Sequence, residues 1–387
     1  MKFRSSILAL IGVLVAAGCA RAAEHEFRAV WVHTWRPGLL SPAEIQETVR
    51  WARDTNMNAL IVQARRVGDA YYNSAYEPRS SSIQAGPDFD PLDCAIKQCR
   101  ANGLEVHAWF NVYRVWTSNT NPPAGHVVNL HPEWLSKEAN GNTGSKDGKF
   151  LDPGVPEVRR YLVKLIADLV SKYDIDGLTL DFVRYPGKNW GYNELAVARF
   201  NTLYGRTGNP PADDPLWCRW RREQVTETVR AIRREVNRLK PGLKLSAATV
   251  SWGPCPSDFS RTDAYAGLFQ DWRLWMEQGL LDANMPMNYK DPSAPKHNQY
   301  FADWLAGARK WSCGRHVYCG LMVFNSNVSG VAAQVKAARE KGLDGIVGFA
   351  FSQADCKSEL SSKLRSTVFS KRVRVPPMRW KAGPKRG

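Results

Sequence analysis

The chain alternates short hydrophobic runs, rich in β-branched residues, with longer runs in which hydrophobic residues recur at helical spacing. The short runs are nearly continuous rather than alternating with polar residues, which is typical of parallel strands buried on both faces. The predicted strands are Phe27–Val32, Ala59–Gln63, Glu105–Phe110, Gly177–Phe182, Leu243–Val250, Ala283–Asn288, Val317–Val323 and Gly345–Phe351. A helical stretch follows each of them, so the pattern predicts successive strand–helix units.

Capping signals agree with the helix boundaries. Ser41, Pro42 and Glu44 form a capping box with proline at the first helical position, and Asp90 and Pro91 begin the next helix. The predicted helices are Ser41–Asp54, Asp90–Asn102, Val155–Tyr173, Asn193–Tyr204 with Pro215–Leu239, Thr262–Gln278, Gln299–Trp311, Ser329–Lys341 and Asp355–Phe369. We expect an α/β protein, a (β/α)8 TIM barrel with long loops at the C-terminal face. An open doubly wound sheet is the alternative, but no glycine-rich phosphate-binding turn follows the first strand.

The two ends of the chain depart from the barrel pattern. A basic start and an apolar run over Ile7–Gly18 predict a secretory signal peptide, and the run is too short for a permanent membrane span. A sequence similar to a lipobox ends at Cys19, which predicts a signal over 1–19 with lipidation of Cys19. Ala20-Arg21-Ala22 is the alternative cleavage site. The barrel is expected over 24–370, and residues 371–387, basic and without an acid, are expected to form a disordered tail.

Composition and charge narrow the range of partners. The formal net charge is +16, and nucleic acid is the usual partner of such a basic chain. An exported protein rarely meets nucleic acid, so we expect none as a partner. Anionic envelope polymers or lipid headgroups are better candidates for the basic tail, and a tail that is merely solvated is favoured over both. The 15 Trp and 13 Tyr suit the apolar faces of sugar rings, although packing accounts for most of them. No spacing of Cys and His resembles a zinc site, and no metal or cofactor is predicted.

Several long motifs lie at the predicted strand ends. They are VQARRVGDAYYNS from Val62, GLEVHAWFNVYR from Gly103, HPEWL from His131, LDPG from Leu151 and DGLTLDFVRYP from Asp176. With these motifs the chain resembles the family-10-like glycosyl hydrolases, the glycosyl hydrolase-like 10 barrels. The resemblance implies a (β/α)8 barrel, an exported lipoprotein and, for some members, cleavage of bacterial cell-wall glycan strands. In the family a second polar residue often follows the aspartate of the fourth strand, whereas this chain has Phe182 there.

Asp181, at the end of the fourth strand, is the predicted general acid. Glycoside cleavage uses one carboxylic acid to protonate the leaving oxygen and a second carboxylate as base or nucleophile. Apolar neighbours such as Phe182 should raise the pKa of Asp181, while Arg184 should lower it. A structural aspartate paired with Arg65 or Arg184 is the alternative. The second carboxylate stays open among residues in or near loops on the same face: Asp69, Glu194, Glu223, Asp258, Asp291 and Asp355.

Polar and aromatic residues at the other strand ends form the predicted binding shell. They are Arg65, Asn111, Tyr113, Arg184, Tyr185, Trp252, Asn288 and Tyr289. Asn325 and Gln353 end the last two strands, and His33 could bind a ligand or brace the site. A glycine-rich loop over Asn140–Lys149 is predicted to be a mobile flap, with a flexible surface insertion without a role as the alternative. Three aspartates that precede strands, Asp176, Asp282 and Asp344, are expected to cap or pair at the opposite face, and His107 is expected in the core.

The sequence therefore predicts a glycoside hydrolase acting on a cell-envelope or extracellular polysaccharide, with peptidoglycan glycan strands as a candidate substrate. A non-catalytic glycan-binding lipoprotein on the same barrel is the alternative, favoured by the missing second carboxylate. A scaffold that captures acidic partners with its basic tail is a third hypothesis. The expected partner is a polysaccharide, with a membrane contact only through a lipid anchor at Cys19.

Overall fold

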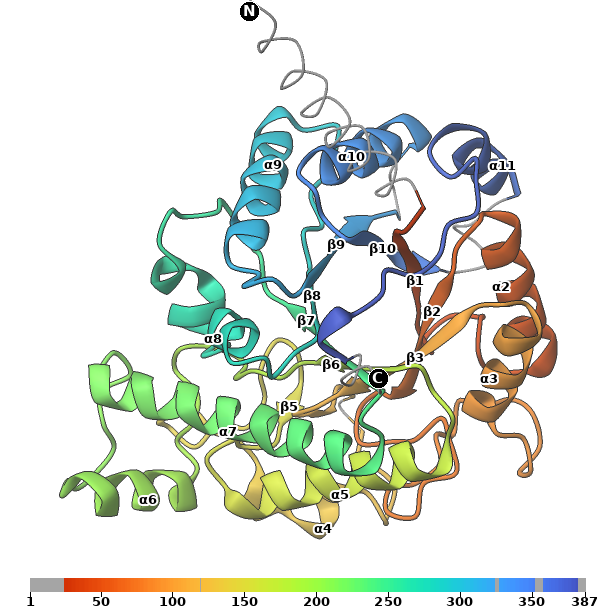
Figure 1. Cartoon of the computed structure of the whole chain (residues 1–387). Helices are drawn as coiled ribbons and strands as arrows, with labels where there is room; N and C mark the ends of the chain where they lie inside the picture. The colour runs from red at the N-terminus through yellow and green to blue at the C-terminus, as the bar shows by residue number, and fades with distance from the viewer. Residues whose placement is uncertain (1–23, 119, 324–326, 352–357, 382–387) are drawn as a thin grey trace, which may run out of the picture.

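The protein is a closed barrel of eight parallel strands surrounded by helices (Figure 1). The computed structural model describes residues 24–118, 120–323, 327–351 and 358–381. The strands follow one another around the barrel in the order β1-β10-β9-β8-β7-β6-β3-β2. Their bounds are β1 Phe27–Val32, β2 Ala59–Arg65, β3 Glu105–Asn111, β6 Gly177–Asp181, β7 Lys244–Thr249, β8 Ala283–Pro286, β9 His316–Met322 and β10 Gly345–Phe351. The predicted (β/α)8 barrel is confirmed.

The helices lie outside the barrel wall (Figure 1). They are α2 Pro42–Asp54, α3 Pro91–Ala101, α5 Pro156–Lys172, α6 Glu194–Tyr204, α7 Pro215–Leu239, α8 Trp272–Glu277, α9 Pro295–Lys310, α10 Val328–Glu340 and α11 Ser358–Thr367. As the sequence predicts, Ser41 and Asp90 cap α2 and α3, each accepting a hydrogen bond from a backbone N–H of the first turn. Within the described chain, none of the helices has the length and apolar character needed to cross a bilayer.

Two hydrophobic cores follow from the alternation of side chains along the strands. Residues such as Trp31, Ile61 and Trp109 fill the barrel interior, while the larger core lies between the strands and the helices. On β6 the inward positions are Gly177, Thr179 and Asp181, because alternate residues share a face. Thr179 bonds Ser246 across the interior, with 2.9 Å between their hydroxyl oxygens. Asp181 is therefore the last inward residue of its strand.

One predicted helix is wrong. The stretch expected as a single helix, Thr262–Gln278, is broken into a π-helical turn over Asp263–Gly267 and then α8, and a 3₁₀ turn over Phe259–Arg261 precedes it. Phe269 has a positive φ of 57°, which no helix tolerates. The side chain of Gln270 accepts a 2.8 Å hydrogen bond from the backbone N–H of Val250. The chain is thus held against the end of β7 before α8 begins.

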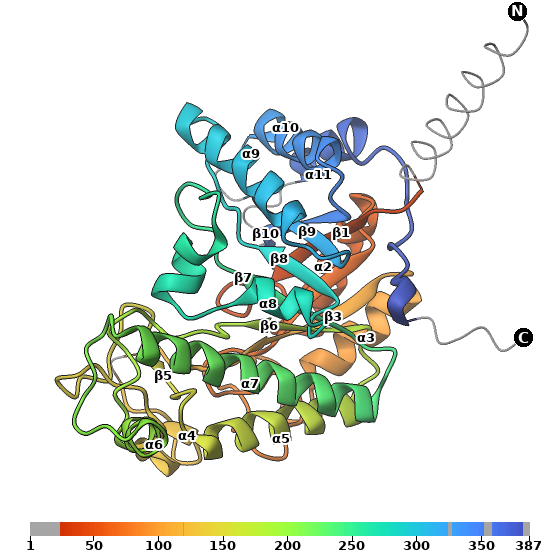
Figure 2. The ribbon, with the colours of Figure 1, turned by 60° about the vertical axis from the view of Figure 1, so that its left-hand side comes forward.

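The connection from β3 to α5 contains small elements of its own. It includes β4 Arg114–Trp116, α4 Val127–Leu130 and β5 Lys149–Phe150, and β4 and β5 pair as antiparallel strands. In Figure 2 the region around β5 lies on the left, on the side of the barrel away from the red start and the dark blue end of the coloured ribbon. The strands thus end at one face, the mouth, and the described chain begins and ends at the other, the N-terminal face.

The expectation of a disordered tail is wrong for residues 371–381, which we term the C-terminal strap. Arg374 bonds through its backbone to Glu24 at 2.9 Å and to Glu26 at 3.0 Å. Further along the strap Met378 is buried, and Trp380 Nε1 donates to Asp282 at 2.9 Å. The apolar residues of the strap pack against the inner core, and this burial orders a segment that charge alone marks as disordered. The signal segment, Cys19 and residues 382–387 lie outside the described residues.

Candidate active site

Asp181 lies at the mouth of the barrel with 8% of its surface exposed. Its Oδ2 accepts a 3.1 Å hydrogen bond from Trp109 Nε1, and its Oδ1 accepts a 2.7 Å bond from the backbone N–H of Phe182. Both donors belong to the strand ends of β3 and β6, so the carboxyl group is held by the barrel itself. No ion pair of Asp181 with a described residue is formed, which sets it apart from a structural aspartate paired with Arg65 or Arg184.

Burial raises the pKa of Asp181 above its usual value, because a charged carboxylate loses its hydration inside the barrel. The backbone N–H of Phe182, the guanidinium groups of Arg114 and Arg184, and Trp109 oppose this rise without cancelling it. The protonated form is therefore favoured relative to a carboxyl group in water. A general acid needs such a raised pKa.

Phe182 takes an uncommon backbone conformation directly after Asp181. Its φ is 48°, and non-glycine residues with positive φ are uncommon and often mark functional sites. The guanidinium carbon of Arg114 lies 4.0 Å from the centre of the Phe182 ring, and that of Arg184 lies 4.9 Å from it. This ring therefore contacts two cations beside the carboxyl group.

The charges of Arg114 and Arg184 act on Asp181, and a third arginine, Arg66, lies close enough to Arg114 to repel it. Arg114 feels Asp181 and Asp147 as attractive charges and Arg66 and Arg184 as repulsive ones, while its burial lowers its pKa to about 10. The buried Nε atoms of Arg66 and Arg114 have no hydrogen-bond partner among the described residues. Buried donors without partners are rare in native proteins. The mouth thus offers guanidinium groups to an acceptor that the protein does not supply.

Asp147 is the carboxylate that the structure places in the same group of charges. It lies in the turn before β5, and its Oδ2 is 3.1 Å from Arg184 Nη2. The neighbouring Lys146 places its Nζ 5.3 Å from the centre of the Trp252 ring. Gly148 fixes this turn, because its φ is 103° and a Cβ atom would lie 2.0 Å from the carbonyl oxygen of Trp116. The loop predicted as a flap therefore contacts both sides of the mouth.

Two exposed indoles stand on either side of this group. Trp35 is 42% exposed and Trp252 is 37% exposed. Trp35 stacks on His33, with ring centres 3.9 Å apart, and lies edge-on to Trp109 at 5.9 Å. Arg184 lies 5.6 Å from the centre of the Trp252 ring. A chain of contacts thus runs from Trp35 through Asp181 to Trp252, and exposed rings beside polar groups suit sugar faces.

Comparison with known proteins adds the family. Residues 26–334 match the model of the family described as Glycosyl hydrolase-like 10. The chain belongs to this family. It is 29% identical to the glycosyl hydrolase YngK of Bacillus subtilis, over 92% of this chain and 74% of that protein. It is 30% identical to the glycosyl hydrolase DigH of Escherichia coli K12, over 60% of this chain and about half (54%) of that protein. The resemblance in the sequence is confirmed, and these relatives support an enzyme of the glycosidase class.

Solved structures agree on the fold. The glycoside hydrolase domain of PgaB from Bordetella bronchiseptica aligns with a TM-score of 0.65 at 14% identity, over 91% of this chain and 100% of that domain. The catalytic domain of β-amylase from Paenibacillus polymyxa aligns with a TM-score of 0.64 at 14% identity, over 90% of this chain and 99% of that one. At such low identity these likenesses show the TIM barrel alone.

In this member of the glycosyl hydrolase-like 10 family, five predicted binding residues are buried braces. Arg65 forms a two-fold ion pair with Glu77, at 2.6 and 2.7 Å. The other four bond to protein groups or pack in the core: Asn111 donates to the carbonyl of Arg66, Asn288 donates to that of Phe301, Tyr185 meets Asp152, and Tyr113 is fully buried. These contacts give the five side chains a bracing role in the structure, and their contact with a substrate stays a prediction.

The remaining predicted binding residues lie around the carboxyl group. The charge of Arg184 lowers the pKa of Asp181, and the Trp252 ring contacts the guanidinium group of Arg184. Tyr289 is half-buried, and burial together with the nearby charge of Asp181 raises its pKa. His33 braces Trp35 by stacking. Asn325 and Gln353 lie outside the described residues.

Most candidates for the second carboxylate have other roles. Glu194 forms an exposed ion pair with Lys137, and Glu223 lies exposed on α7 near Arg230. Three more cap local turns: Asp69, Asp258 and Asp291 accept from the backbone N–H groups of Val67, Ser260 and Ser293. Asp355 lies outside the described residues. Asp147 was missed, because its loop is far in the sequence from the ends of the eight barrel strands.

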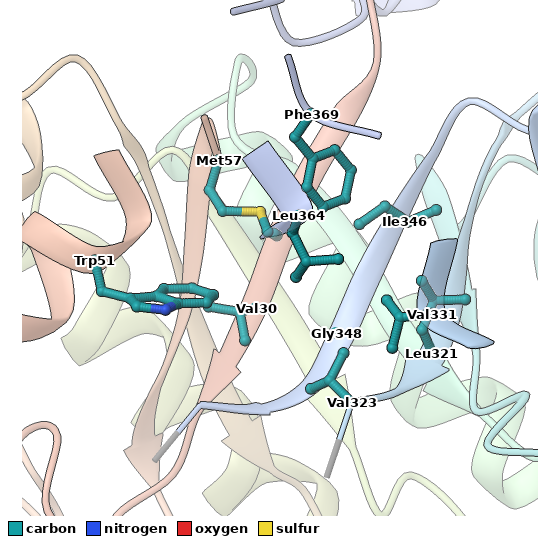
Figure 3. Close-up of a pocket in the computed structure, with 11 residues that line it drawn as sticks. Val30, Trp51, Met57, Leu321, Val323, Val331, Ile346, Gly348, Leu364 and Phe369 are labelled. Carbon is teal, nitrogen blue, oxygen red and sulfur yellow. The ribbon is translucent and has the colours of Figure 1, made fainter. Parts of the chain in front are cut away.

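A separate apolar cavity is unsuited to a sugar. Figure 3 shows it outside the barrel wall, lined by Trp51, Met57, Leu364 and Phe369 among other apolar side chains. Its volume of about 20 Å³ is hardly more than one water molecule needs, and such apolar voids stay dry. Within the described ranges no group of three or more His, Cys, Asp or Glu could hold a metal ion.

Proposed function

We propose that the protein is a glycoside hydrolase that acts on a cell-envelope or extracellular polysaccharide, with Asp181 as the general acid. The observation that supports this most strongly is the buried carboxyl group at the mouth, with a raised pKa and two fixed hydrogen-bond donors. In the proposed step Asp181 gives its proton to the glycosidic oxygen as the bond to the anomeric carbon breaks. Trp109 and the Phe182 N–H then stabilise the carboxylate that remains.

Asp147 is the proposed second carboxylate. It shares Arg184 with Asp181, and both carboxyl groups act on Arg114. From the turn before β5 it can act on the opposite face of a sugar ring as base or nucleophile, which completes the pair that hydrolysis requires. The turn holding it also carries Lys146 against Trp252, so substrate binding at that indole would position the carboxylate.

The charges of the mouth favour a glycan that carries acidic groups. Arg66, Arg114 and Arg184 face two carboxylates, and two of these arginines have Nε donors without a described partner. Carboxylates of a substrate are natural acceptors for such guanidinium groups. Together with the predicted signal peptide, this supports an acidic polysaccharide of the cell envelope, for which peptidoglycan glycan strands are a candidate.

Substitution of Asp181 tests the proposal. Asp181→Asn should lower the release of new reducing ends from isolated glycan strands by about 10²–10⁴-fold, because the amide cannot donate a proton in the same way. Asp152→Asn is the matched control. Asp152 is a buried aspartate like Asp181, and burial raises its pKa to about 6, but it contacts Tyr185 behind the mouth. Turnover by Asp181→Asn equal to that of the control would remove Asp181 from catalysis.

A non-catalytic glycan-binding protein is the second candidate. The ion pair between Asp147 and Arg184 favours it, since a paired carboxylate is a weaker base or nucleophile. This alternative predicts binding of glycan strands by the wild-type protein with no new reducing ends, and the same binding by Asp181→Asn.

A further inference from the structure

We propose that the N-terminal face of the barrel is a docking surface for a membrane that carries anionic lipid headgroups. The C-terminal strap forms this surface. Its contact residues are four exposed cations: Lys371, Arg372, Arg374 and Arg379. This inference concerns the face opposite Asp181 and does not depend on the chemistry at the mouth.

The strap is a fixed platform. Its backbone pairs with the segment that leads into β1, and its apolar residues Val375, Met378 and Trp380 pack against the inner core. Lys381 anchors the far end, with Nζ 3.1 Å from Asp282 Oδ2 and 2.6 Å from the carbonyl oxygen of Leu243. Charges on an ordered segment lose little conformational entropy when they meet a surface.

The four exposed cations are not paired with acidic side chains in the part of the chain that the structure describes. None of them forms an ion pair with another residue of the described ranges, whereas the buried Lys381 and Arg233 both pair with Asp282. No acidic residue occurs between 371 and 387. An anionic bilayer surface would neutralise these side chains, with a gain of about 1 kcal/mol for each cation near the surface.

The position of the chain ends indicates a membrane rather than a free polymer. Glu24, where the described chain begins, accepts a hydrogen bond from the Arg374 backbone and so lies beside the cations. Cys19, the predicted lipidation site, is five residues earlier in the sequence, and five extended residues span at most about 18 Å. A lipid there would hold this face at the bilayer, and stable anchoring commonly combines a lipid with a basic patch.

Docking at this face would orient the molecule. Asp181 lies at the opposite end of the strands, and a strand of five to seven residues rises about 20 Å. In Figure 2 the strap and the loops around β5 lie on opposite sides of the barrel. The mouth would therefore face away from the bilayer, toward a polymer beyond the membrane surface.

Vesicle co-sedimentation tests the docking surface without the lipid anchor. The protein begins at Ala20, which retains every described residue and removes Cys19. It should sediment with vesicles that contain phosphatidylglycerol and stay in solution with pure phosphatidylcholine. Each removed cation should lower the partition coefficient about fivefold, so the combined K371Q, R372Q, R374Q and R379Q variant should lose binding to anionic vesicles.

A matched variant removes four exposed cations from segments near the mouth: K188Q, R219Q, R261Q and K296Q. It should bind anionic vesicles as the unchanged protein does, and both variants should keep the same unfolding midpoint. Equal loss in the two variants would attribute binding to net charge and overturn the proposal. Capture by soluble polygalacturonate but not by vesicles would also overturn it, in favour of an acidic polymer. Glycan cleavage is not measured in this assay, so its outcome is independent of the proposed hydrolase activity.

Discussion

The two ends of the barrel use carboxyl groups in opposite ways. At the N-terminal face, Asp176, Asp282 and Asp344 each precede a strand and accept from the backbone N–H of the neighbouring strand, at 2.8, 2.8 and 2.9 Å. Asn58 does the same for the N–H of Arg28 at 2.9 Å. At the mouth, Asp181 instead accepts from Trp109 and from Phe182, the residue that follows it.

The energetic consequences differ accordingly. Burial alone would raise the pKa of Asp282. The charges of Arg233 and Lys381 and the hydrogen bond from the Leu245 N–H lower it by more, so the pKa is below its usual value. At Asp181 burial prevails and the pKa is raised. The N-terminal face therefore stabilises the carboxylate of Asp282, and the mouth holds Asp181 in a state suited to proton transfer. Stability and chemistry are separated along the same strands.

The largest expected effect is on stability at the N-terminal face. Asp282→Ala leaves Arg233 and Lys381 without their buried partner, and breaking a buried ion pair this way costs about 3–5 kcal/mol. Asp174→Ala is the control, because Asp174 pairs with Arg100 on the surface at 2.6 Å, and such exposed pairs contribute under about 1 kcal/mol. Urea unfolding measures both. Equal losses would show that this face does not derive stability from buried carboxylates.

The two faces should also differ in how their carboxyl groups make the free energy of unfolding depend on pH. The folded pKa of Asp282 is lowered, so its stabilisation is present above the unfolded pKa and is lost as pH falls through the folded pKa. The folded pKa of Asp181 is raised, so its effect runs the other way: stability is lost as pH rises through the folded pKa. Near neutral pH, Asp181→Asn should therefore leave stability unchanged or increase it, whereas Asp282→Ala lowers it.

The next effect is on catalysis, through the carboxylate of the turn before β5. Asp147→Asn should lower kcat about 100-fold or more while the fold is kept, because a base or nucleophile contributes at least that much. Asp213→Asn, a change of an aspartate in the loop before α7, is the control and should be silent. A drop confined to KM would show that Asp147 only positions Arg184 or substrate.

The sequence predicted much of this molecule, for physical reasons that also explain its failures. Continuous apolar runs identified the strands, and the aspartates before Gly177, Ala283 and Gly345 were expected at the stability face, where the structure places them. The residue type at a strand end, however, does not reveal whether its side chain bonds to the protein backbone, as the amide nitrogens of Asn111 and Asn288 do.

The missed residues depend on contacts between distant segments. Trp109 could have been found from the period of two that puts it on the inner face of β3 with His107 and Asn111. Trp35 and Asp147 carry no such signal, since only the closed barrel and the pairing of β4 with β5 bring their loops to Asp181. The order of the strap likewise comes from burial against a core that local charge does not reveal.

The smallest expected effect separates binding from chemistry at the mouth. Trp252→Ala should raise KM about two- to tenfold with kcat unchanged, because a stacked ring contributes about 0.5–1.5 kcal/mol to sugar binding. Tyr76→Ala is the control. Tyr76 is 41% exposed and has Lys164 Nζ 4.1 Å from its ring centre, as Trp252 has Lys146, but it lies beside α5. A fall in kcat instead would mean that the indole acts on the reacting bond through Arg184.

Because Trp35 and Trp252 lie on opposite sides of Asp181, they should hold different sugar units. The effects of Trp35→Ala and Trp252→Ala on KM should therefore multiply in the double variant. Failure to multiply would place both rings on one sugar and shorten the proposed binding surface to a single unit.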